Sequence, residues 1–378
     1  MSVKFFQIQA RDKQTHARQG VLTTAHGQIE TPVFMPVGTA GTVKAMPHQF
    51  LEDLKADVIL ANTYHLYLRP GLETIQGQGG LHRFMSWDRA ILTDSGGYQV
   101  FSHRALRKIN EEGVEFQSHL DGSFHFFTPE KAIQLQQTFG ADIIMMFDDC
   151  TPYPVSESEA RESMRRSMRW AERCMEVHGS QEAALFGIAQ GSVFIEQRKE
   201  SLDRLAEIDL PGLALGGFGV GEPKLLMYEL VEQLNEFMPE DKPRYLMGIG
   251  TPLDLFYCVR QGIDMFDCVL PTRNARNGML FTSAGPVRIK NARYRDDRRP
   301  LDPGCACFVC QRYTRSYLRH LHVSGEIVSS VLNTYHNLHF YLDLMNRIRQ
   351  SIALDSLLKL ESDFRERYAE STEESMVY

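Results

Sequence analysis

The chain has 378 residues, of which 43% are hydrophobic and 24% charged, the composition of an ordinary globular protein. Its formal net charge of -7 argues against nucleic-acid binding by the whole surface, although it is compatible with a local basic patch. No apolar run reaches the roughly 18 residues that a membrane-spanning helix needs, and the first residues are too polar for a signal peptide. We therefore expect a cytoplasmic protein with no membrane contact.

Residues 1–30 alternate apolar and polar side chains around a turn at Gly27, which predicts an antiparallel sheet that caps the next part of the chain. Eight short apolar runs follow, each of the length of a buried strand. These runs are 32–38, 58–63, 91–97, 143–149, 185–191, 213–217, 245–250 and 265–270. Most segments between them have helical periodicity, most clearly 156–177, 195–208 and 224–237.

Strands that alternate with helices imply a parallel sheet covered by helices, and eight repeats favour closure of that sheet into a barrel. We therefore expect an α/β protein in which residues 1–378 form a single (β/α)8 TIM barrel domain with an N-terminal antiparallel sheet. An open doubly wound sheet is disfavoured because no Gly-x-Gly-x-x-Gly turn follows the first strand. A hairpin at 114–127, turning at Asp121-Gly122, is inserted after the third strand.

The alternation stops after Gly278. The segment 279–290 has the pattern of a hairpin, and 314–368 is mostly amphipathic helix. Between them lie three thiols with the close spacing typical of a zinc site, namely Cys305, Cys307 and Cys310. We expect residues 279–340 to form a zinc-binding subdomain packed on the barrel.

A zinc ion held by these thiolates needs a fourth ligand from the helical region downstream. Four histidines compete for that position: His320, His322, His336 and His339. Because four protein ligands leave no position for water, the predicted zinc is structural and holds the insertion in shape. The other cysteines are scattered along the chain, so no disulfide framework is predicted.

Asp267 has an unusual position, because it interrupts the apolar run 265–270 just before a polar loop that carries Arg273 and Arg276. An ionised carboxylate in a buried strand costs several kcal/mol unless it is paired or functional. Two interpretations are open at this point, an ion pair with a neighbouring arginine and a catalytic role.

The active site of a barrel of this kind lies at the carboxyl ends of its strands, where residues distant in sequence converge. The predicted strands end in Asp94, Asp148, Gln190, Gly216, Gly217 and Asp267. Any single aspartate has the alternative role of capping the next helix, but three together favour a site. Two carboxylates across one carbon suit glycosidic chemistry, in which one attacks the sugar carbon and the other moves a proton.

The strand ends also suit a polar heterocycle as ligand. Gln190 offers a donor and an acceptor to the edge of a base, and the glycines allow close approach of the backbone. Tyr98 and Met247 are candidate stacking faces, although such residues are more often part of a core. Basic residues are concentrated between 273 and 319, which in an acidic chain favours an anionic partner over a merely solvated surface.

The chain resembles the bacterial tRNA-guanine transglycosylases along nearly its whole length. The motifs that carry the resemblance are FMPVG at 34–38, DSGG at 94–97 with QVF at 99–101, TPYP at 151–154, KPRYLMG at 242–248, GIDMFDC at 262–268 and PTRNARNG at 271–278. The last of these is highly specific. The resemblance implies a zinc-containing (β/α)8 enzyme.

The activity that this resemblance implies is a base exchange in tRNA. The wobble guanine of tRNAs with a GUN anticodon, those for aspartate, asparagine, histidine and tyrosine, is replaced by 7-aminomethyl-7-deazaguanine, a precursor of queuosine. By the same resemblance Asp267 attacks C1′ of the ribose and gives a covalent enzyme–RNA intermediate, and Asp94 is the proton acceptor for the incoming deazaguanine. Double displacement retains the anomeric configuration.

The resemblance also implies roles for the remaining candidates. The base is bound by Asp94, Tyr98, Asp148, Gln190, Gly217 and Met247. Arg273 and Arg276 contact the nucleotides that flank the target in a U-G-U anticodon loop, and extrusion of an unpaired loop base is comparatively cheap. The zinc ligands become Cys305, Cys307, Cys310 and His336, because NTYHN at 333–337 is the family's pattern. A homodimer that binds one tRNA is implied as well.

Three segments depart from the family's usual pattern, and none of them removes a catalytic group. Ser102-His-Arg-Ala105 stands where Ser-Leu-Gly is usual after Val-Phe, and Asp149 stands where glutamate is common. Gly217-Phe-Gly-Val220 stands where Gly-Leu-Ala-Val is usual. Phe218 adjoins the predicted base pocket and therefore bears on which deazaguanine is preferred.

Three alternatives stand beside this interpretation. The nearest is the eukaryotic-type enzyme, which takes free queuine. A carboxylate glycoside hydrolase on the same barrel accounts for Asp94 and Asp267 but not for the cysteine cluster. A catalytically silent, zinc-dependent tRNA-binding subunit accounts for the cysteines and arginines but gives no reason for an intact set of carboxylates.

Overall fold

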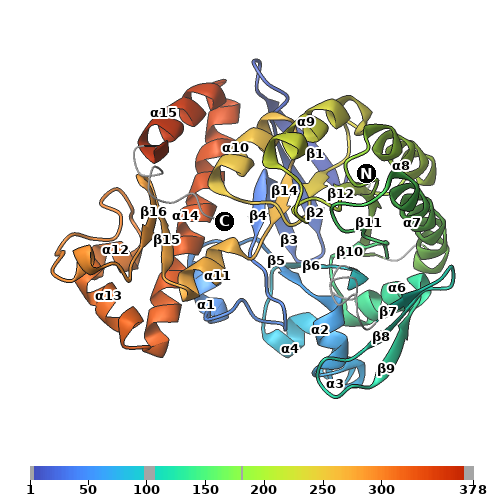
Figure 1. The fold of residues 1–378 in the computed structure, drawn as a ribbon, viewed down its shortest axis with the longest axis horizontal. Coiled ribbons are helices and arrows are strands. Elements are labelled where there is room, and N and C mark those ends of the chain that lie inside the picture. Colours follow the sequence, from blue (N-terminus) through green and yellow to red (C-terminus); the bar gives the residue numbers. More distant parts are fainter. Residues whose placement is uncertain (1–3, 98–106, 180–181, 370–378) are drawn as a thin grey trace.

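A parallel sheet of eight strands organises the molecule (Figure 1). The computed structural model describes residues 4–97, 107–179 and 182–369. In chain order the strands are β4 (Val33–Met35), β5 (Val58–Ala61), β6 (Ala90–Thr93), β10 (Ile143–Met145), β11 (Ala184–Ala189), β12 (Gly212–Leu215), β13 (Arg244–Leu246) and β14 (Met265–Asp267). Each strand pairs with the next, β14 pairs with β4, and a bridge from Val37 to Leu60 joins β4 to β5. The sheet thus closes into the predicted barrel.

Helices surround this barrel and connect its strands (Figure 1). They are α1 (His48–Asp53), α2 (Thr63–Leu68), α3 (Leu72–Gly77), α4 (Leu81–Met85), α6 (Pro129–Phe139), α7 (Glu157–His178), α8 (Ile195–Ile208), α9 (Lys224–Leu234) and α10 (Pro252–Arg260). Local sequence determines where the longest of them begins, because Ser156 and Glu159 form a reciprocal capping box at α7. The helices predicted at 156–177 and 195–208 are confirmed, and the one at 224–237 ends in a 3-10 turn, η2 (Asn235–Phe237).

The N-terminal antiparallel sheet consists of β1 (Phe6–Arg11), β2 (Arg18–Thr24) and β3 (Gly27–Thr31). Two contacts attach it to the amino ends of the barrel strands. The buried Arg18 guanidinium lies 2.6 Å from the carboxylate of Asp264, one residue before β14. His26 Nδ1 lies 2.8 Å from Asp142, one residue before β10. The sheet therefore caps the barrel, as predicted, and it does so at the end opposite to the carboxyl ends of the strands.

A second antiparallel sheet is inserted between β6 and α6. Its strands are β7 (Arg107–Ile109), β8 (Val114–Gln117) and β9 (Phe124–Phe127). The hairpin predicted at 114–127 is confirmed, and β7 adds a third strand that the sequence pattern did not predict.

The chain after the barrel forms α11 (Leu270–Arg276), β15 (Met279–Thr282), β16 (Gly285–Arg288), η3 (Ala292–Tyr294), α12 (Phe308–Arg312), α13 (Arg315–Val323), α14 (Ile327–Ala353) and α15 (Leu357–Ala369). The hairpin and the helical C-terminal part are confirmed. The long helix α14 packs against α11, α13 and β15 and also reaches β4 in the barrel. Among the helices described, none combines the length and apolar content needed to cross a bilayer.

One local prediction was wrong. The strand expected over 265–270 ends at Asp267, and the expected polar loop is the helix α11. Pro271 lies in the first turn of that helix, where a missing backbone N–H costs nothing and the fixed φ is favourable. Arg273 and Arg276 are therefore presented by a helix beside the barrel mouth and not by a loop.

Candidate active site

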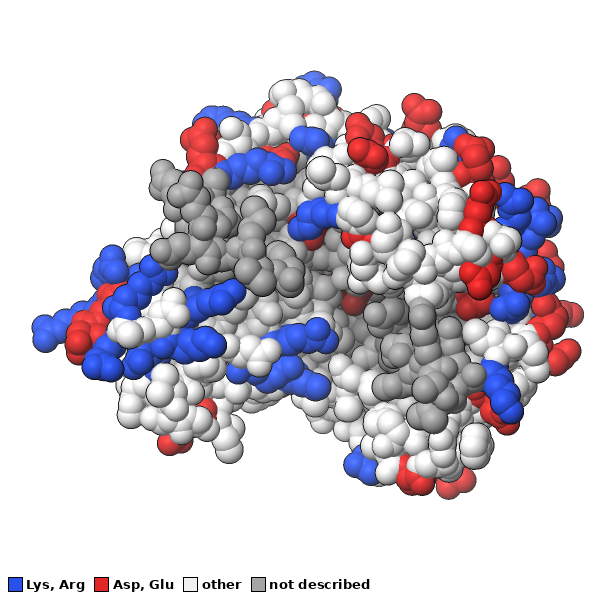
Figure 2. Space-filling view, viewed as in Figure 1, with Lys and Arg blue, Asp and Glu red and all other residues white. Residues whose placement is uncertain are grey.

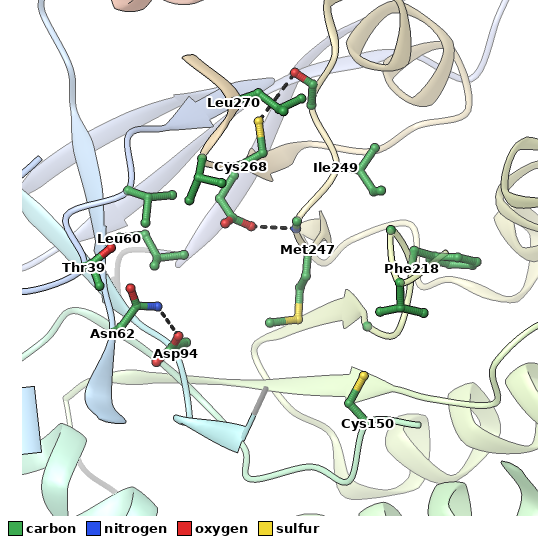
Figure 3. A pocket seen from close by; sticks show the side chains of 18 of the residues that line it. Thr39, Leu60, Asn62, Asp94, Cys150, Phe218, Met247, Ile249, Cys268 and Leu270 are labelled. Carbon is green, nitrogen blue, oxygen red and sulfur yellow. Dashed lines mark hydrogen bonds between the residues drawn. The ribbon is translucent and has the colours of Figure 1, made fainter. Parts of the chain in front are cut away.

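A cavity of about 720 Å³ opens at the carboxyl ends of the barrel strands (Figure 3). Residues that end or follow six different strands line it, and they are Asp94, Asp148, Gln190, Gly217, Met247 and Asp267. The structure therefore brings together all six predicted strand-end residues, Gly216 included, because closure of the barrel places these ends side by side. Tyr98 lies outside the described residues.

Asp267 is the last residue of β14, and its carboxylate faces the cavity. Its Oδ1 accepts hydrogen bonds from the Tyr245 hydroxyl at 2.6 Å and from the Gly248 backbone N–H at 2.8 Å. Burial raises the pKa of Asp267, and the two hydrogen bonds oppose that rise by stabilising the ionised form. Within the described ranges no arginine lies at ion-pair distance from Asp267, so the ion-pair interpretation is not supported.

Asp94 lies directly after β6 and is held from the neighbouring strand end. Its carboxylate accepts hydrogen bonds from the Asn62 side chain, which Figure 3 shows beside it, and from the Thr63 backbone N–H at 2.9 Å. The Gly96 N–H donates to it at 3.2 Å. Asp94 thus contacts the first turn of α2, and these hydrogen bonds hold it at the cavity wall.

Asp148 and Gln190 form one hydrogen-bonded unit at the base of the cavity. Gln190 Nε2 donates to Asp148 Oδ2 at 2.7 Å. Burial raises the pKa of Asp148 to about 7, although the hydrogen bond from Gln190 opposes the shift. Near neutral pH this carboxyl group is therefore able to act as donor or acceptor, which suits the mixed edge of a purine-like base.

Gly216 and Gly217 lie against the side chain of Gln190. A Cβ on Gly217 would lie 2.5 Å from Gln190 Oε1, and one on Gly216 would lie 2.7 Å from Gln190 Nε2. Gly217 also has a φ of 68°, in the left-handed region that favours glycine. Larger residues at either position would therefore displace Gln190, so the two glycines allow this turn to pack closely against it.

Two of the family departures are described by the structure, and neither side chain blocks the cavity. Asp149 pairs with Arg166 of α7 at 2.7 Å and is not part of the lining. The Phe218 ring points away from Met247 and Asp94 (Figure 3). The segment 102–105 lies outside the described residues.

Arg273 and Arg276 of α11 both line the cavity at its rim. Burial and the charge of Arg273 lower the pKa of Arg276, so this region favours an anion that would relieve the repulsion. In Figure 2 lysine and arginine predominate over the surface that Figure 1 assigns to α11, α12 and α13, whereas acidic and basic residues mix over α7 and α8. The basic region predicted from the sequence is thus continuous with the cavity mouth.

The three clustered thiols converge on one imidazole of α14. His336 Nδ1 lies 3.9, 3.5 and 3.4 Å from the sulfurs of Cys305, Cys307 and Cys310. A tetrahedral zinc ion with ordinary bond lengths separates such nitrogen and sulfur ligands by about 3.5 Å. His336 Nε2 lies 2.7 Å from the Phe281 carbonyl, which fixes the tautomer that leaves Nδ1 as the ligand.

These four residues are able to hold one metal ion in a closed site. Among the rival histidines, His339 approaches only the sulfur of Cys305, at 3.5 Å. The structure therefore selects His336 from the four histidines that spacing alone left open.

Among the polar side chains of the cavity that sequence reasoning missed are Asn62 and Tyr245, which hydrogen-bond to Asp94 and Asp267. Asn62 lies at the end of the apolar run 58–63, so the criterion that selected Asp94, a polar residue at the end of a predicted strand, would have found it. No such criterion would have found Tyr245, because it lies inside a strand. Its contact with Asp267 depends on the pairing of β13 with β14, which only the structure shows.

Comparison with known proteins agrees with this geometry. The family model described as Queuine tRNA-ribosyltransferase matches residues 12–370. A queuine tRNA-ribosyltransferase of Caldanaerobacter subterraneus is 54% identical over 370 residues, which cover 98% of this chain and 99% of that protein. A protein of the same name from Koribacter versatilis is 55% identical, with 94% of this chain and 95% of that protein covered. The chain therefore belongs to the queuine tRNA-ribosyltransferase family.

Proposed function

We propose that this chain is a tRNA-guanine transglycosylase. It exchanges the wobble guanine of tRNAs with a GUN anticodon for 7-aminomethyl-7-deazaguanine, a precursor of queuosine. The observation that carries the proposal is the convergence of Asp94, Asp148 and Asp267 on one cavity of a chain in this family. A tRNA substrate also accounts for the basic surface beside the cavity mouth. With such a substrate, the proposed location is the cytoplasm.

In the proposed reaction Asp267 is the nucleophile. Its carboxylate attacks C1′ of the ribose while the bond from C1′ to the guanine nitrogen breaks, and a covalent enzyme–RNA ester forms. The guanine leaves with the bonding electron pair and takes up a proton. The incoming deazaguanine then gives up its proton to Asp94 and attacks C1′, which releases Asp267 and retains the anomeric configuration. The hydrogen bonds from Tyr245 and Gly248 support this role, because they keep a buried carboxylate ionised and oriented.

Base recognition is assigned to the residues around the Asp148–Gln190 unit. Asp94, Asp148 and Gln190 hydrogen-bond the edge of the base, the Gly217 backbone contributes a further contact, and Met247 covers one face. Tyr98 is proposed for the opposite face, on the ground of the family resemblance alone.

RNA recognition is assigned to Arg273 and Arg276, which contact the nucleotides on either side of the target in a U-G-U loop. Their support is the position of both side chains at the cavity rim. A homodimer that binds one tRNA is part of the same proposal.

The metal is proposed to be one structural zinc ion, because three thiolates and one imidazole in a closed set match its preferred ligands. Cys305, Cys307, Cys310 and His336 would hold it. We further propose that 279–340 is a zinc-binding subdomain within a single transglycosylase domain. The packing of α14 against both β15 and β4 supports this arrangement.

The test is incorporation of labelled guanine into an anticodon stem-loop that contains U-G-U, with a loop in which the target guanine is adenine as control. We expect incorporation only into the U-G-U loop. Asp267→Ala should abolish exchange, by at least about 10³-fold, while binding of the stem-loop stays near wild type.

Failure of the folded, zinc-loaded protein to incorporate guanine would overturn the proposal. Binding of the stem-loop without exchange would favour a silent tRNA-binding subunit. Near wild-type turnover of Asp267→Ala would refute only the assignment of the nucleophile.

A further inference from the structure

Arg198 of α8 is a fully buried arginine behind the base pocket. Its Nε donates to the Ser192 carbonyl at 2.6 Å, and its Nη2 donates to the Gly216 carbonyl at 3.1 Å. Across the described ranges no carboxylate lies at ion-pair distance from this guanidinium. A charge buried without a counter-ion is costly, so main-chain carbonyls and a neighbouring ring are what stabilise it.

That ring belongs to Phe218. The guanidinium carbon of Arg198 lies 3.7 Å from the centre of the Phe218 ring, a close stacked contact. Phe218 is only 5% exposed, and its ring points away from the middle of the cavity (Figure 3). The ring therefore anchors the turn from behind and does not fill the space in which a base would lie.

The same helix also holds Gln190. The Gln190 backbone N–H donates to Ser201 Oγ at 3.1 Å, and Ser201 lies one turn after Arg198 on α8. Gly191 packs so closely on this helix that a Cβ there would lie 2.8 Å from the Arg198 backbone nitrogen. Helix α8 thus supports both sides of the base pocket, Gln190 through Ser201 and the turn at 216–218 through Arg198.

The far half of the turn has a separate anchor. The Glu222 carboxylate accepts hydrogen bonds from Gly219 N–H at 2.6 Å and from Val220 N–H at 3.0 Å. Loss of the Arg198–Phe218 contact would therefore release only the half of the turn that contains Gly217, while the rest stays attached.

We propose that Arg198 and Phe218 form a positioning pair that holds the Gly216–Gly217 turn against Gln190 and thereby sets the affinity for the incoming base. This inference rests on the proposed function. Neither side chain reaches Asp94 or Asp267, so the pair acts on binding of the base and not on the attack at C1′. Phe218, where the family usually has leucine, would therefore change how the turn is held in place and not the volume of the pocket.

The test uses Phe218→Leu and Arg198→Lys in the full-length protein. Leucine keeps an apolar side chain but loses the aromatic face, and lysine keeps the charge but loses the planar stack and the forked donors. We expect each variant to raise the KM for the base by about 3- to 30-fold, in line with a desolvated cation–π contact. The kcat and the KM for tRNA should stay within about 2-fold of wild type.

A second cation–aromatic pair, whose cation also lies on α8, provides a control. Lys199 lies 4.8 Å from the Phe237 ring, a cation–aromatic pair that is not part of the cavity lining. Phe237→Leu should leave the KM for the base unchanged. In a double-mutant cycle the effects of Phe218→Leu and Arg198→Lys on the KM for the base should be strongly non-additive, because both changes remove the same contact.

Unchanged KM for the base in both folded variants would overturn the inference, and so would a loss of kcat and melting temperature with no selective effect on the base. If Arg198→Lys does not fold, Phe218→Leu alone decides. If wild type performs no exchange, the proposed function fails. Equilibrium binding of 7-aminomethyl-7-deazaguanine to the same variants then tests the positioning pair separately, and equal affinities would refute it.

Discussion

The Tyr245 hydroxyl donates a 2.6 Å hydrogen bond to Oδ1 of Asp267 from the neighbouring barrel strand. Burial and the charge of Asp267 raise the pKa of Tyr245 well above its usual value, so the phenol keeps its proton and acts as the donor. Burial also raises the pKa of Asp267, and the bond from Tyr245 opposes this rise. The tyrosine thus helps to keep the proposed nucleophile ionised.

Tyr245→Phe should slow base exchange by about 10- to 100-fold, since a hydrogen bond to a charged group contributes about 1.5–3 kcal/mol. Without the donor the pKa of Asp267 rises further, so the acid limb of the pH–rate profile should move to higher pH. Tyr257→Phe, which removes a hydroxyl bonded to the exposed Glu232, serves as control. An unshifted acid limb at normal folding would contradict this role for Tyr245.

Asp148→Asn should change the pH dependence of stability. The pKa of Asp148 is about 7 in the folded protein and about 4 when exposed, so the folded state binds this proton more tightly. The resulting stability is fully present below about pH 4 and is lost as the pH rises through 7. Asparagine cannot ionise, so the melting temperature of the variant relative to wild type should rise between about pH 4 and about pH 7 and stay level above that.

The measurement is the difference in melting temperature between variant and wild type across this pH range. Asp203→Asn, at an exposed position of α8, is the surface control against which this difference is compared. If the melting-temperature difference for Asp148→Asn did not change with pH, the carboxyl group of Asp148 would not titrate in this range.

Cys307→Ser should remove the bound metal and lower stability, because metal binding to a closed site contributes directly to folding. We expect about one zinc per chain in wild type by elemental analysis, and much less in the variant. The control is Cys174→Ser, since Cys174 is buried between α7 and the barrel and lies outside the metal cluster. A Cys307→Ser protein with normal zinc and normal melting temperature would exclude the proposed ligand set.

Arg276→Ala should weaken binding of the anticodon stem-loop at low salt. If this side chain contacts a phosphate, the slope of log affinity against log salt should become shallower by about one. Arg161→Ala on α7 is a suitable comparison, because that arginine is half-exposed and paired with Glu157 on another face. Equal salt slopes for wild type and Arg276→Ala would argue against a phosphate contact.

Some features of the site were accessible from local sequence and others were not. The apolar runs predicted all eight barrel strands, because burial of a short strand on both faces needs consecutive apolar residues. The extent of the last strand was wrong, since an apolar segment that begins with Val269 and Leu270 suits the buried start of α11 equally well. Apolar composition does not by itself distinguish the two.

By itself the sequence determined the α/β barrel class, the strand ends that would carry chemistry, and the cluster of Cys305, Cys307 and Cys310, because these depend on periodicity and spacing within short segments. Spacing alone left four histidines open as the fourth ligand, the family resemblance implied His336, and the structure places His336 in the cluster. Only the tertiary structure decided that Tyr245 bonds Asp267 and that Arg198 stacks on Phe218. The physical reason is that each of these contacts joins elements distant in the chain. Their proximity follows from barrel closure and helix packing, which no local pattern encodes.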